Sequence, residues 1–152
     1  MNWSFNLPVR LEFGNGKRKE LKTFIDSLGG TKGLLVCDGI FAENGVAEEF
    51  LSMSDGMLVD SFSDIRPNPT TDNVNACVAK LREIGADFAV ALGGGSSMDT
   101  AKAIGIIVNN PEFADVRSLE GVAPTKKHAV FTIAVPTTAG TAAEVTINYV
   151  IT

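Results

Sequence analysis

The sequence predicts an α/β fold: a Rossmann-like open parallel sheet with helices on both faces and an N-terminal β-hairpin. Short runs such as GLLVCD (33–38) and DFAVAL (87–92) are apolar almost throughout, which is typical of strands buried on both faces of a parallel sheet. These runs alternate with segments of helical periodicity, the order of elements that βαβ units require. The length of 152 residues suits a single domain spanning 1–152.

Local signals define the elements of the first half of the chain. Residues 3–16 alternate on either side of Pro8, which favours a hairpin or a pair of edge strands. An amphipathic helix over 18–28 ends at Gly29. Its apolar face carries Leu21, Phe24, Ile25 and Leu28. The pattern then predicts a strand at 33–38, a helix within 45–53 and a strand at 57–62.

The second half repeats the alternation of strand and helix. After a turn-rich link, a helix is expected with Thr71 or Asp72 as its N-cap. Its apolar face carries Val74, Cys77, Val78, Leu81 and Ile84. The pattern further predicts a strand at 87–92, a helix at 97–110, a loop with one helical turn at 109–121 and a strand at 128–136. The β-branched, alternating residues 144–152 are typical of a further strand.

Composition and charge exclude several classes of protein. The net charge is −5 and the pI about 4.8, with no basic stripe, which argues against a nucleic-acid partner. No apolar run is long enough to span a membrane, and the first residues lack the pattern of a signal peptide. Cys37 and Cys77 lie in apolar surroundings, so we expect reduced core cysteines rather than a disulfide. These features indicate a cytoplasmic protein.

Consecutive glycines, Gly93 to Gly95, lie between a predicted strand and a predicted helix and are followed by Ser96 and Ser97. Glycine lets the backbone approach a phosphate group closely, and the first turn of a helix favours an anion. The turn therefore indicates phosphate binding, although a tight strand-to-helix connection also uses glycine. It matches neither familiar nucleotide motif: Met98 stands where G-x-G-x-x-G needs its third glycine, and Lys102 is too far along the helix for a P-loop.

Two further features fit a nucleotide but also fit ordinary local structure. Asp38 ends a predicted strand, where a carboxylate can accept both hydroxyls of an adenosine ribose and repel a 2′-phosphate. The same carboxylate could instead cap the next helix. The stretch PTTAGT (136–141) follows another strand and offers three hydroxyl groups. These suit phosphate or ribose oxygens, yet a turn stabilised by side-chain hydroxyls uses similar residues.

The paired motifs GGGSSMDTAKAIG (93–105) and PTTAGTAAEVTINYVIT (136–152) resemble the cofactor-binding half of the iron-containing (group III) alcohol dehydrogenases. The resemblance covers essentially the whole chain, and Asp38 and PNPT (67–70) are also in place. It implies NAD as the cofactor, a small alcohol or aldehyde as the substrate and a homodimer joined through the N-terminal strands. Dehydroquinate synthases and glycerol dehydrogenases share the glycine-and-aspartate turn, but the other motifs fit them less well.

The resemblance assigns a role to each matching position. Asp38 would hold the adenosine ribose and favour NAD over NADP, and Asn68 would lie near the adenine. The pyrophosphate would be held by Gly94, Gly95 and Ser96, with Asp99 close behind on the helix.

The second motif would line the phosphate and nicotinamide side of the same cofactor. Its residues are Thr137, Thr138, Ala139, Gly140 and Thr141, with Asn148 at the far end. Many family members have glycine and serine where this chain has Ala142 and Ala143, a change in polarity near the nicotinamide that should leave binding intact.

In the resembled family the metal, Fe²⁺ or Zn²⁺, is held by an aspartate and three histidines of an all-helical second domain. The chain has one histidine, His128, so we expect no metal ligand within 1–152. No residue is a convincing general acid or base, because Asp99 and Glu144 are better explained by capping or by pairing with Lys102.

The resemblance therefore implies the NAD-binding half of a metal-dependent alcohol dehydrogenase that transfers a hydride between NAD(H) and a small alcohol, diol or aldehyde. The 152 residues alone are expected to be inactive. The alternative is a non-catalytic module for NAD binding or oligomerisation.

Overall fold

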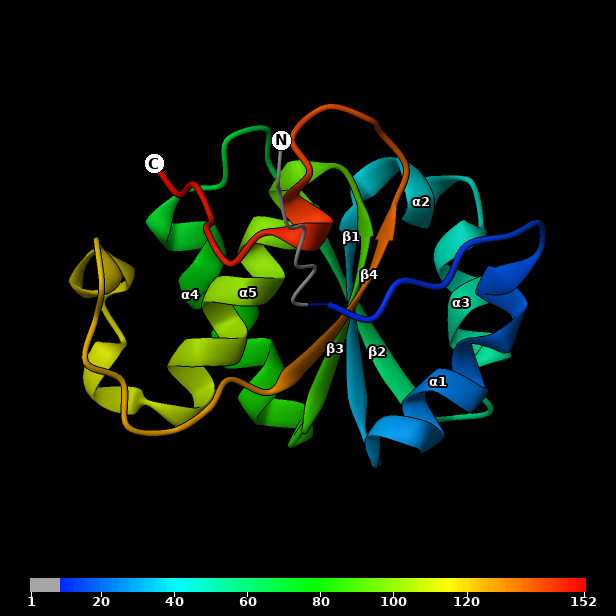
Figure 1. The fold of residues 1–152 in the computed structure, drawn as a ribbon, viewed down its shortest axis with the longest axis horizontal. Helices are drawn as coiled ribbons and strands as arrows, with labels where there is room; N and C mark the ends of the chain where they lie inside the picture. The colour runs from blue at the N-terminus through cyan, green and yellow to red at the C-terminus, as the bar shows by residue number, and fades with distance from the viewer. Residues whose placement is uncertain (1–8) are drawn as a thin grey trace, which may run out of the picture.

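The computed structural model describes residues 9–152, in which strands and helices alternate (Figure 1). The strands are β1 (Gly33–Asp38), β2 (Leu58–Ile65), β3 (Phe88–Gly93) and β4 (Phe131–Pro136). The α-helices are α1 (Leu21–Leu28), α2 (Gly39–Glu43), α3 (Val46–Met53), α4 (Thr71–Ile84) and α5 (Gly95–Asn109). Short 3-10 turns are η1 (Lys17–Glu20), η2 (Pro111–Phe113), η3 (Val116–Leu119) and η4 (Ala143–Val145).

The strands form one parallel sheet in the order β2-β1-β3-β4. The helices α1, α2 and α3 cover one face and α4 and α5 the other, on the right and left of Figure 1. This double cover explains the apolar strands, because Gly33 to Cys37 and Phe88 to Gly93 are all buried. The predicted Rossmann-like α/β fold with a parallel sheet is confirmed.

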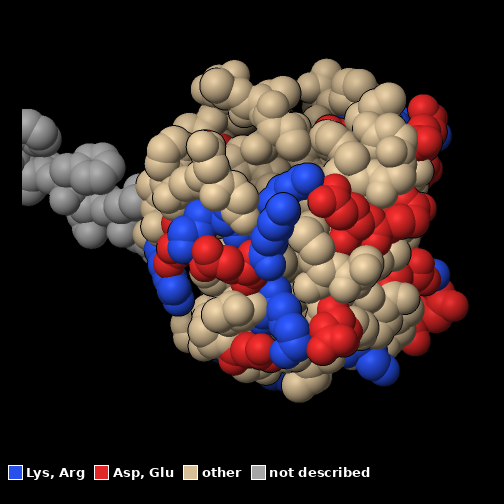
Figure 2. All heavy atoms as spheres, turned by 90° about the vertical axis from the view of Figure 1, so that its right-hand side faces the viewer, with Lys and Arg blue, Asp and Glu red and all other residues tan. Residues whose placement is uncertain are grey.

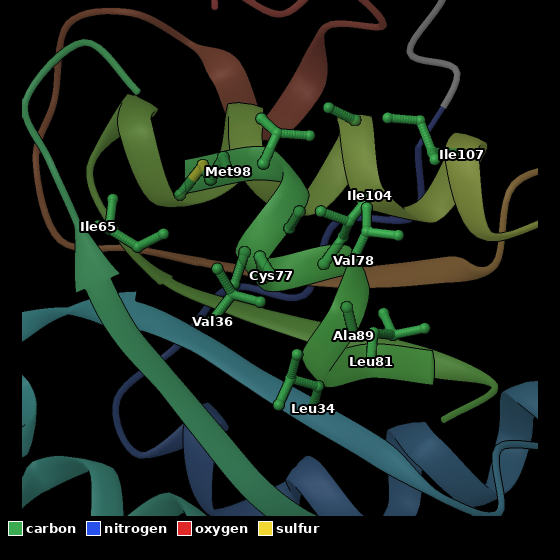
Figure 3. Packing of buried hydrophobic residues seen from close by; sticks show 14 of the residues in the cluster. Leu34, Val36, Ile65, Cys77, Val78, Leu81, Ala89, Met98, Ile104 and Ile107 are labelled. Atoms are coloured by element: carbon green, nitrogen blue, oxygen red, sulfur yellow. The ribbon is translucent and has the colours of Figure 1, made fainter. Parts of the chain in front are cut away.

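Each face of the sheet has its own apolar core. Between the sheet and α4 and α5, Leu34 and Val36 of β1 pack with helix residues such as Leu81 and Ile104 (Figure 3). The intervening Leu35 of β1 joins the opposite cluster, against α1 and α3. Successive side chains of a strand point to opposite faces, so one short run of sequence supplies both cores.

Cys37 and Cys77 are free and buried on opposite faces of the sheet. Burial raises the pKa of the Cys37 thiol to about 11, and burial also raises the pKa of Cys77. Both thiols are therefore protonated at neutral pH and pack as small apolar groups. The prediction of reduced core cysteines is confirmed.

The face formed by α1 and α3 carries acidic and basic side chains in close alternation (Figure 2). Arg18 lies 2.9 Å from Glu49, and Lys22 lies 2.9 Å from Asp26 within α1. These pairs are exposed, so each contributes little to stability. Acidic side chains also gather along the right-hand edge of this face in Figure 2, with few basic ones among them.

The predicted hairpin over residues 3–16 lies partly outside the described residues. Within the described part, residues 9–16 form no strand, which corrects the prediction there. Leu11 and Phe13 are 62% and 94% exposed, so the alternation does not divide a buried face from a solvated one. Among residues 9–152, the neighbouring edge strand β4 pairs with β3 alone.

The alternating residues 144–152 are also not a strand. They begin with η4 and continue as an extended segment, and Ile147 is 84% exposed. The segment is fixed at its end instead: Thr152 donates its N–H to the Pro69 carbonyl (2.9 Å), and its carbonyl accepts from Thr71 N–H (3.2 Å). Periodicity alone does not make a strand where no neighbouring strand supplies a ladder.

Smaller differences concern the ends of helices. The N-cap of α4 is Thr70, whose hydroxyl accepts from the Asn73 N–H (3.3 Å), rather than Thr71 or Asp72. Leu28, expected on the buried face of α1, is half exposed because it lies in the last turn of the helix. The loop at 109–121 holds two 3-10 turns instead of one, and the short helix α2 was not predicted.

Asp87 joins the loop before β1 to the start of β3. Its carboxylate accepts hydrogen bonds from the Thr31 hydroxyl (2.6 Å) and from the backbone N–H groups of Thr31 and Lys32. Burial raises the pKa of Asp87, but these hydrogen bonds together outweigh burial and lower the pKa. A lowered folded pKa stabilises the fold above the unfolded value, about 3.9, and this stabilisation is lost as the pH falls through the folded pKa.

We therefore expect Asp87→Asn to reduce the free energy of unfolding at neutral pH by at most about 1 kcal/mol, because the carboxylate is exposed and screened. The difference from the wild type should shrink below about pH 4 and vanish once Asp87 is protonated. Urea unfolding between neutral pH and about pH 3 measures it. A difference that does not change with pH would contradict the role of the ionised carboxylate.

Candidate functional site

The sheet has a topological switch point between β1 and β3. From β1 the chain moves outward to β2, whereas from β3 it moves outward to β4 in the opposite direction. In open α/β sheets, ligands bind outside the carboxyl ends of the strands at such a point. Asp38 ends β1 and Gly93 ends β3, so both predicted motifs lie at this edge.

The Asp38 carboxylate is turned toward the start of α5. Ser97 donates its hydroxyl to Asp38 Oδ1 (2.7 Å), and the Gly94 N–H points to Oδ2 at 3.4 Å. Asp38 occupies the N-cap position of α2, but its side chain makes no capping hydrogen bond there. The carboxylate therefore joins two distant elements instead of capping the next helix.

Gly93 makes room for this contact. Its φ is +144°, a conformation that side chains rarely adopt, and a Cβ there would lie 2.6 Å from Asp38 Oδ2 and 2.7 Å from Ser97 Oγ. The glycine is thus required both by the backbone and by the carboxylate beside it.

Gly94 and Gly95 bring the two motifs together. A Cβ on Gly94 would lie 3.1 Å from Thr138 Oγ1, and a Cβ on Gly95 would lie 3.1 Å from Thr141 Oγ1. The threonine hydroxyls thus approach the turn at the N-terminus of α5, where the first N–H groups have no partner within the helix. Hydroxyl donors beside free N–H groups form a surface that favours an anionic oxygen.

A cleft of about 450 Å³ lies beside this turn. It contains half of the residues predicted for cofactor binding: Asn68, Gly95, Ser96, Asp99, Thr141 and Asn148. Asn68 adopts a left-handed conformation (φ +55°), which asparagine tolerates better than most residues. Three separate segments of the sequence, within 68–69, 95–99 and 141–150, therefore contribute to one cleft.

The other predicted residues lie outside the lining of this cleft. Asp38 and Gly94 are beside it, at the switch point. Thr138 packs on the turn, while the Thr137 N–H donates to the Gly93 carbonyl (2.9 Å), so this residue supports the turn through its backbone. Ala139 and Gly140 are exposed.

Asp99 and Lys102 fasten the extended C-terminal segment to α5. Asp99 Oδ2 accepts from the Val150 N–H (3.1 Å), and its other oxygen lies 3.6 Å from Lys102 Nζ. Lys102 also donates to the Asn148 carbonyl (2.7 Å). Burial lowers the pKa of Lys102, and the charge of Asp99 opposes this shift. The pairing of Asp99 with Lys102 is confirmed, and both residues hold one wall of the cleft.

Several residues of the site were not among the predicted ones. Ser97 is fully buried on Asp38, and Thr146, Tyr149 and Val150 line the cleft. Ser97 had one signal in the sequence, a second hydroxyl directly after Ser96. The other three had none, because they belong to a segment whose pattern is typical of a strand.

A second hollow, an apolar groove of about 490 Å³, lies between residues 9–13, α1 and β4. Its exposed lining is mostly apolar, and none of the predicted cofactor residues lines it. The polar cleft beside Asp38 and the glycine turn is therefore the candidate site.

A family model described as iron-containing alcohol dehydrogenase matches residues 8–152. The chain belongs to the iron-containing alcohol dehydrogenase family. The resemblance stated from the paired motifs is confirmed.

Several members of the family align with most of the chain. Lactaldehyde reductase of Escherichia coli K12 is 49% identical over 142 residues, which cover 92% of this chain and 37% of that protein. NAD-dependent methanol dehydrogenase of Bacillus methanolicus is 34% identical over 151 residues, 98% of this chain and 39% of that protein. The structure of sulfoacetaldehyde reductase from Bifidobacterium kashiwanohense in complex with NAD⁺ has a TM-score of 0.86 and 35% identity, covering 96% of this chain and 39% of that one.

The chain thus spans less than two fifths of the length of these relatives. Between residues 9 and 152 there is no group of three or more His, Cys, Asp or Glu side chains that could hold a metal ion. The residues described here therefore do not fit the metal of the family name. No helix in this part of the chain is long and apolar enough to cross a membrane.

Proposed function

We propose that this chain is the NAD-binding domain, over 1–152, of an iron-containing alcohol dehydrogenase that acts on a small alcohol, diol or aldehyde. The observation that supports this most is the meeting of Asp38, the glycine turn and the cleft at the switch point of the sheet. Family membership and the likeness to a neighbour solved with NAD⁺ support the same cofactor.

Different residues of the chain bind different parts of the dinucleotide. Free N–H groups of Gly95 and Ser96, at the positive end of the α5 dipole, bind the diphosphate. The Asp38 carboxylate accepts ribose hydroxyls and repels a 2′-phosphate. The hydroxyl groups of Thr138 and Thr141 stand beside the turn and orient the cofactor toward its nicotinamide end. When bound, the cofactor supplies or accepts the hydride.

In the complete enzyme, an all-helical second domain supplies the ligands of the metal, Fe²⁺ or Zn²⁺, and most of the substrate pocket. The chain alone is then a cofactor platform without turnover. We propose a cytoplasmic location, a reducing compartment in which the free Cys37 and Cys77 stay reduced.

A homodimer is the second part of the proposal. Exposed Leu11 and Phe13 lie at the apolar groove beside the outer edge of β4, where the N-terminal segment of a second copy would bury them. Sedimentation of the chain, compared with Leu11→Glu, tests it. A monomer at all concentrations would exclude a dimer through this surface.

Titration calorimetry with NADH and NADPH tests cofactor binding. We expect the wild type to bind NADH and to bind NADPH poorly, because the Asp38 carboxylate faces the ribose. Asp38→Ala should weaken NADH binding by about tenfold or more, because hydrogen bonds to a charged group are lost. The same variant should bind NADPH as well as it binds NADH. Binding of neither cofactor by the wild type would reject the proposed function for this chain.

A further inference from the structure

Asp38 is held by a residue far from it in sequence. Ser97 is fully buried in the first turns of α5, and its hydroxyl donates to Asp38 Oδ1 at 2.7 Å. The gap left by Gly93 lets the two side chains meet, since a Cβ there would lie within 2.7 Å of both. Three elements, β1, β3 and α5, therefore converge on one carboxylate.

The contact selects one of two arrangements open to Asp38. The backbone of Asp38 has the extended conformation of an N-cap at the start of α2, where an aspartate ordinarily accepts a hydrogen bond from the helix. Its side chain makes no such bond. The Ser97 hydroxyl thus draws the carboxylate away from α2 and toward the glycine turn.

The same contact leaves the carboxylate able to bind a ligand. An ionised carboxylate has about four acceptor positions. Ser97 uses one of them, and the Gly94 N–H, at 3.4 Å, weakly uses another. About two positions remain, which matches the two hydroxyls of a ribose.

We infer that Ser97 is a positioning residue that fixes Asp38 and so sets the discrimination between a dinucleotide with a free 2′-hydroxyl and one with a 2′-phosphate. This inference rests on the proposed function, in which Asp38 faces the adenosine ribose. Ser97 touches neither cofactor and acts only through the carboxylate. Without its hydroxyl, Asp38 turns to cap α2, the ribose loses its acceptor, and the charge that repels a 2′-phosphate moves away.

The test is the ratio of the NADPH and NADH dissociation constants of the full 152-residue chain, measured by calorimetry. Ser97→Ala should raise the dissociation constant for NADH by about tenfold and leave that for NADPH unchanged or lower, so the ratio falls by about tenfold. If Ser97 had a purely structural role, its replacement would weaken the binding of both cofactors together. Ser97→Cys keeps the volume but is a weak donor, and it should lower the ratio in the same direction.

Two further variants separate the explanations. Ser96→Ala removes the neighbouring hydroxyl but keeps the backbone N–H proposed to bind the diphosphate, which both cofactors share, so it should keep the ratio. In the Asp38→Ala background, Ser97→Ala should not change the ratio further, because the residue through which it acts is gone.

The outcomes distinguish this inference from the proposed function. If the wild type binds NADH but Ser97→Ala and Ser97→Cys keep the wild-type ratio, the positioning role is wrong and the function stands. A change of ratio by Ser97→Ala in the absence of Asp38 also overturns it. If the wild type binds neither cofactor, the function and the inference fall together.

Discussion

Gly93→Ala is expected to lower the free energy of unfolding by about 3 kcal/mol, from backbone strain and crowding of about 1–3 kcal/mol each. Alanine at this position would have to adopt a φ near +144°, and its Cβ would lie 2.6 Å from Asp38 Oδ2. The carboxylate and the Ser97 hydroxyl must then separate, so NADH binding should be lost as well. Urea unfolding and calorimetry measure the two effects.

Gly140→Ala is the matched control for this change. Gly140 has a similar φ of +150°, but a Cβ there meets no atom within 4 Å. The control therefore carries the backbone strain without the crowding, and it should cost about 1–3 kcal/mol less than Gly93→Ala. Equal losses of stability in the two variants would show that the Asp38 contact contributes nothing to the requirement for glycine.

Phe88→Ala is expected to lower the free energy of unfolding by about 3–5 kcal/mol, the usual cost of deleting a buried aromatic ring. Phe88 is fully buried at the start of β3 and stacks on Phe131 of β4, with ring centroids 5.1 Å apart. Its ring also fills the space that Gly30 and Gly33 leave open, because a Cβ on either glycine would lie within 2.7 Å of it. The cavity would thus open against β1, β4 and the loop between α1 and β1.

Phe13→Ala is the control of the same chemistry at the surface. Phe13 is 94% exposed in the single chain, so its removal should change the stability of the monomer, measured at low protein concentration, by no more than about 0.5 kcal/mol. Thermal or urea unfolding of the two variants gives the comparison. A loss for Phe88→Ala no larger than that for Phe13→Ala would mean that the sheet does not depend on this ring.

The elements predicted from the sequence are those whose signals are local. The apolar run at 33–37 and the periodic helix face from Val74 to Leu81 are buried as expected, because a residue's position in a strand or helix determines the direction of its side chain. For the extended residues 144–152, the same reasoning gave a wrong prediction. Their alternation is a strand pattern, but a strand also needs a neighbour, and no local signal says whether one is there.

The candidate site could likewise be predicted only in part from the sequence. Gly95, Ser96 and Thr141 stand together in the cleft, as the paired motifs implied. Ser97 was left out of the predicted set, although its hydroxyl holds Asp38 across a separation of 59 residues. A hydrogen bond of that span leaves no periodicity in the chain, so only the folded arrangement reveals it.

Neighbouring residues and matching motifs were sufficient to predict the order of strands and helices, the burial of the sheet on both faces, the family and the glycine turn. Only the folded chain shows that Asp38 turns to Ser97 instead of capping α2, and that Asp99 and Lys102 hold residues 148–150 against α5. Where a side chain has two possible partners, the distances set by the packed sheet and helices determine which hydrogen bond forms. Those distances exist only once the chain has folded.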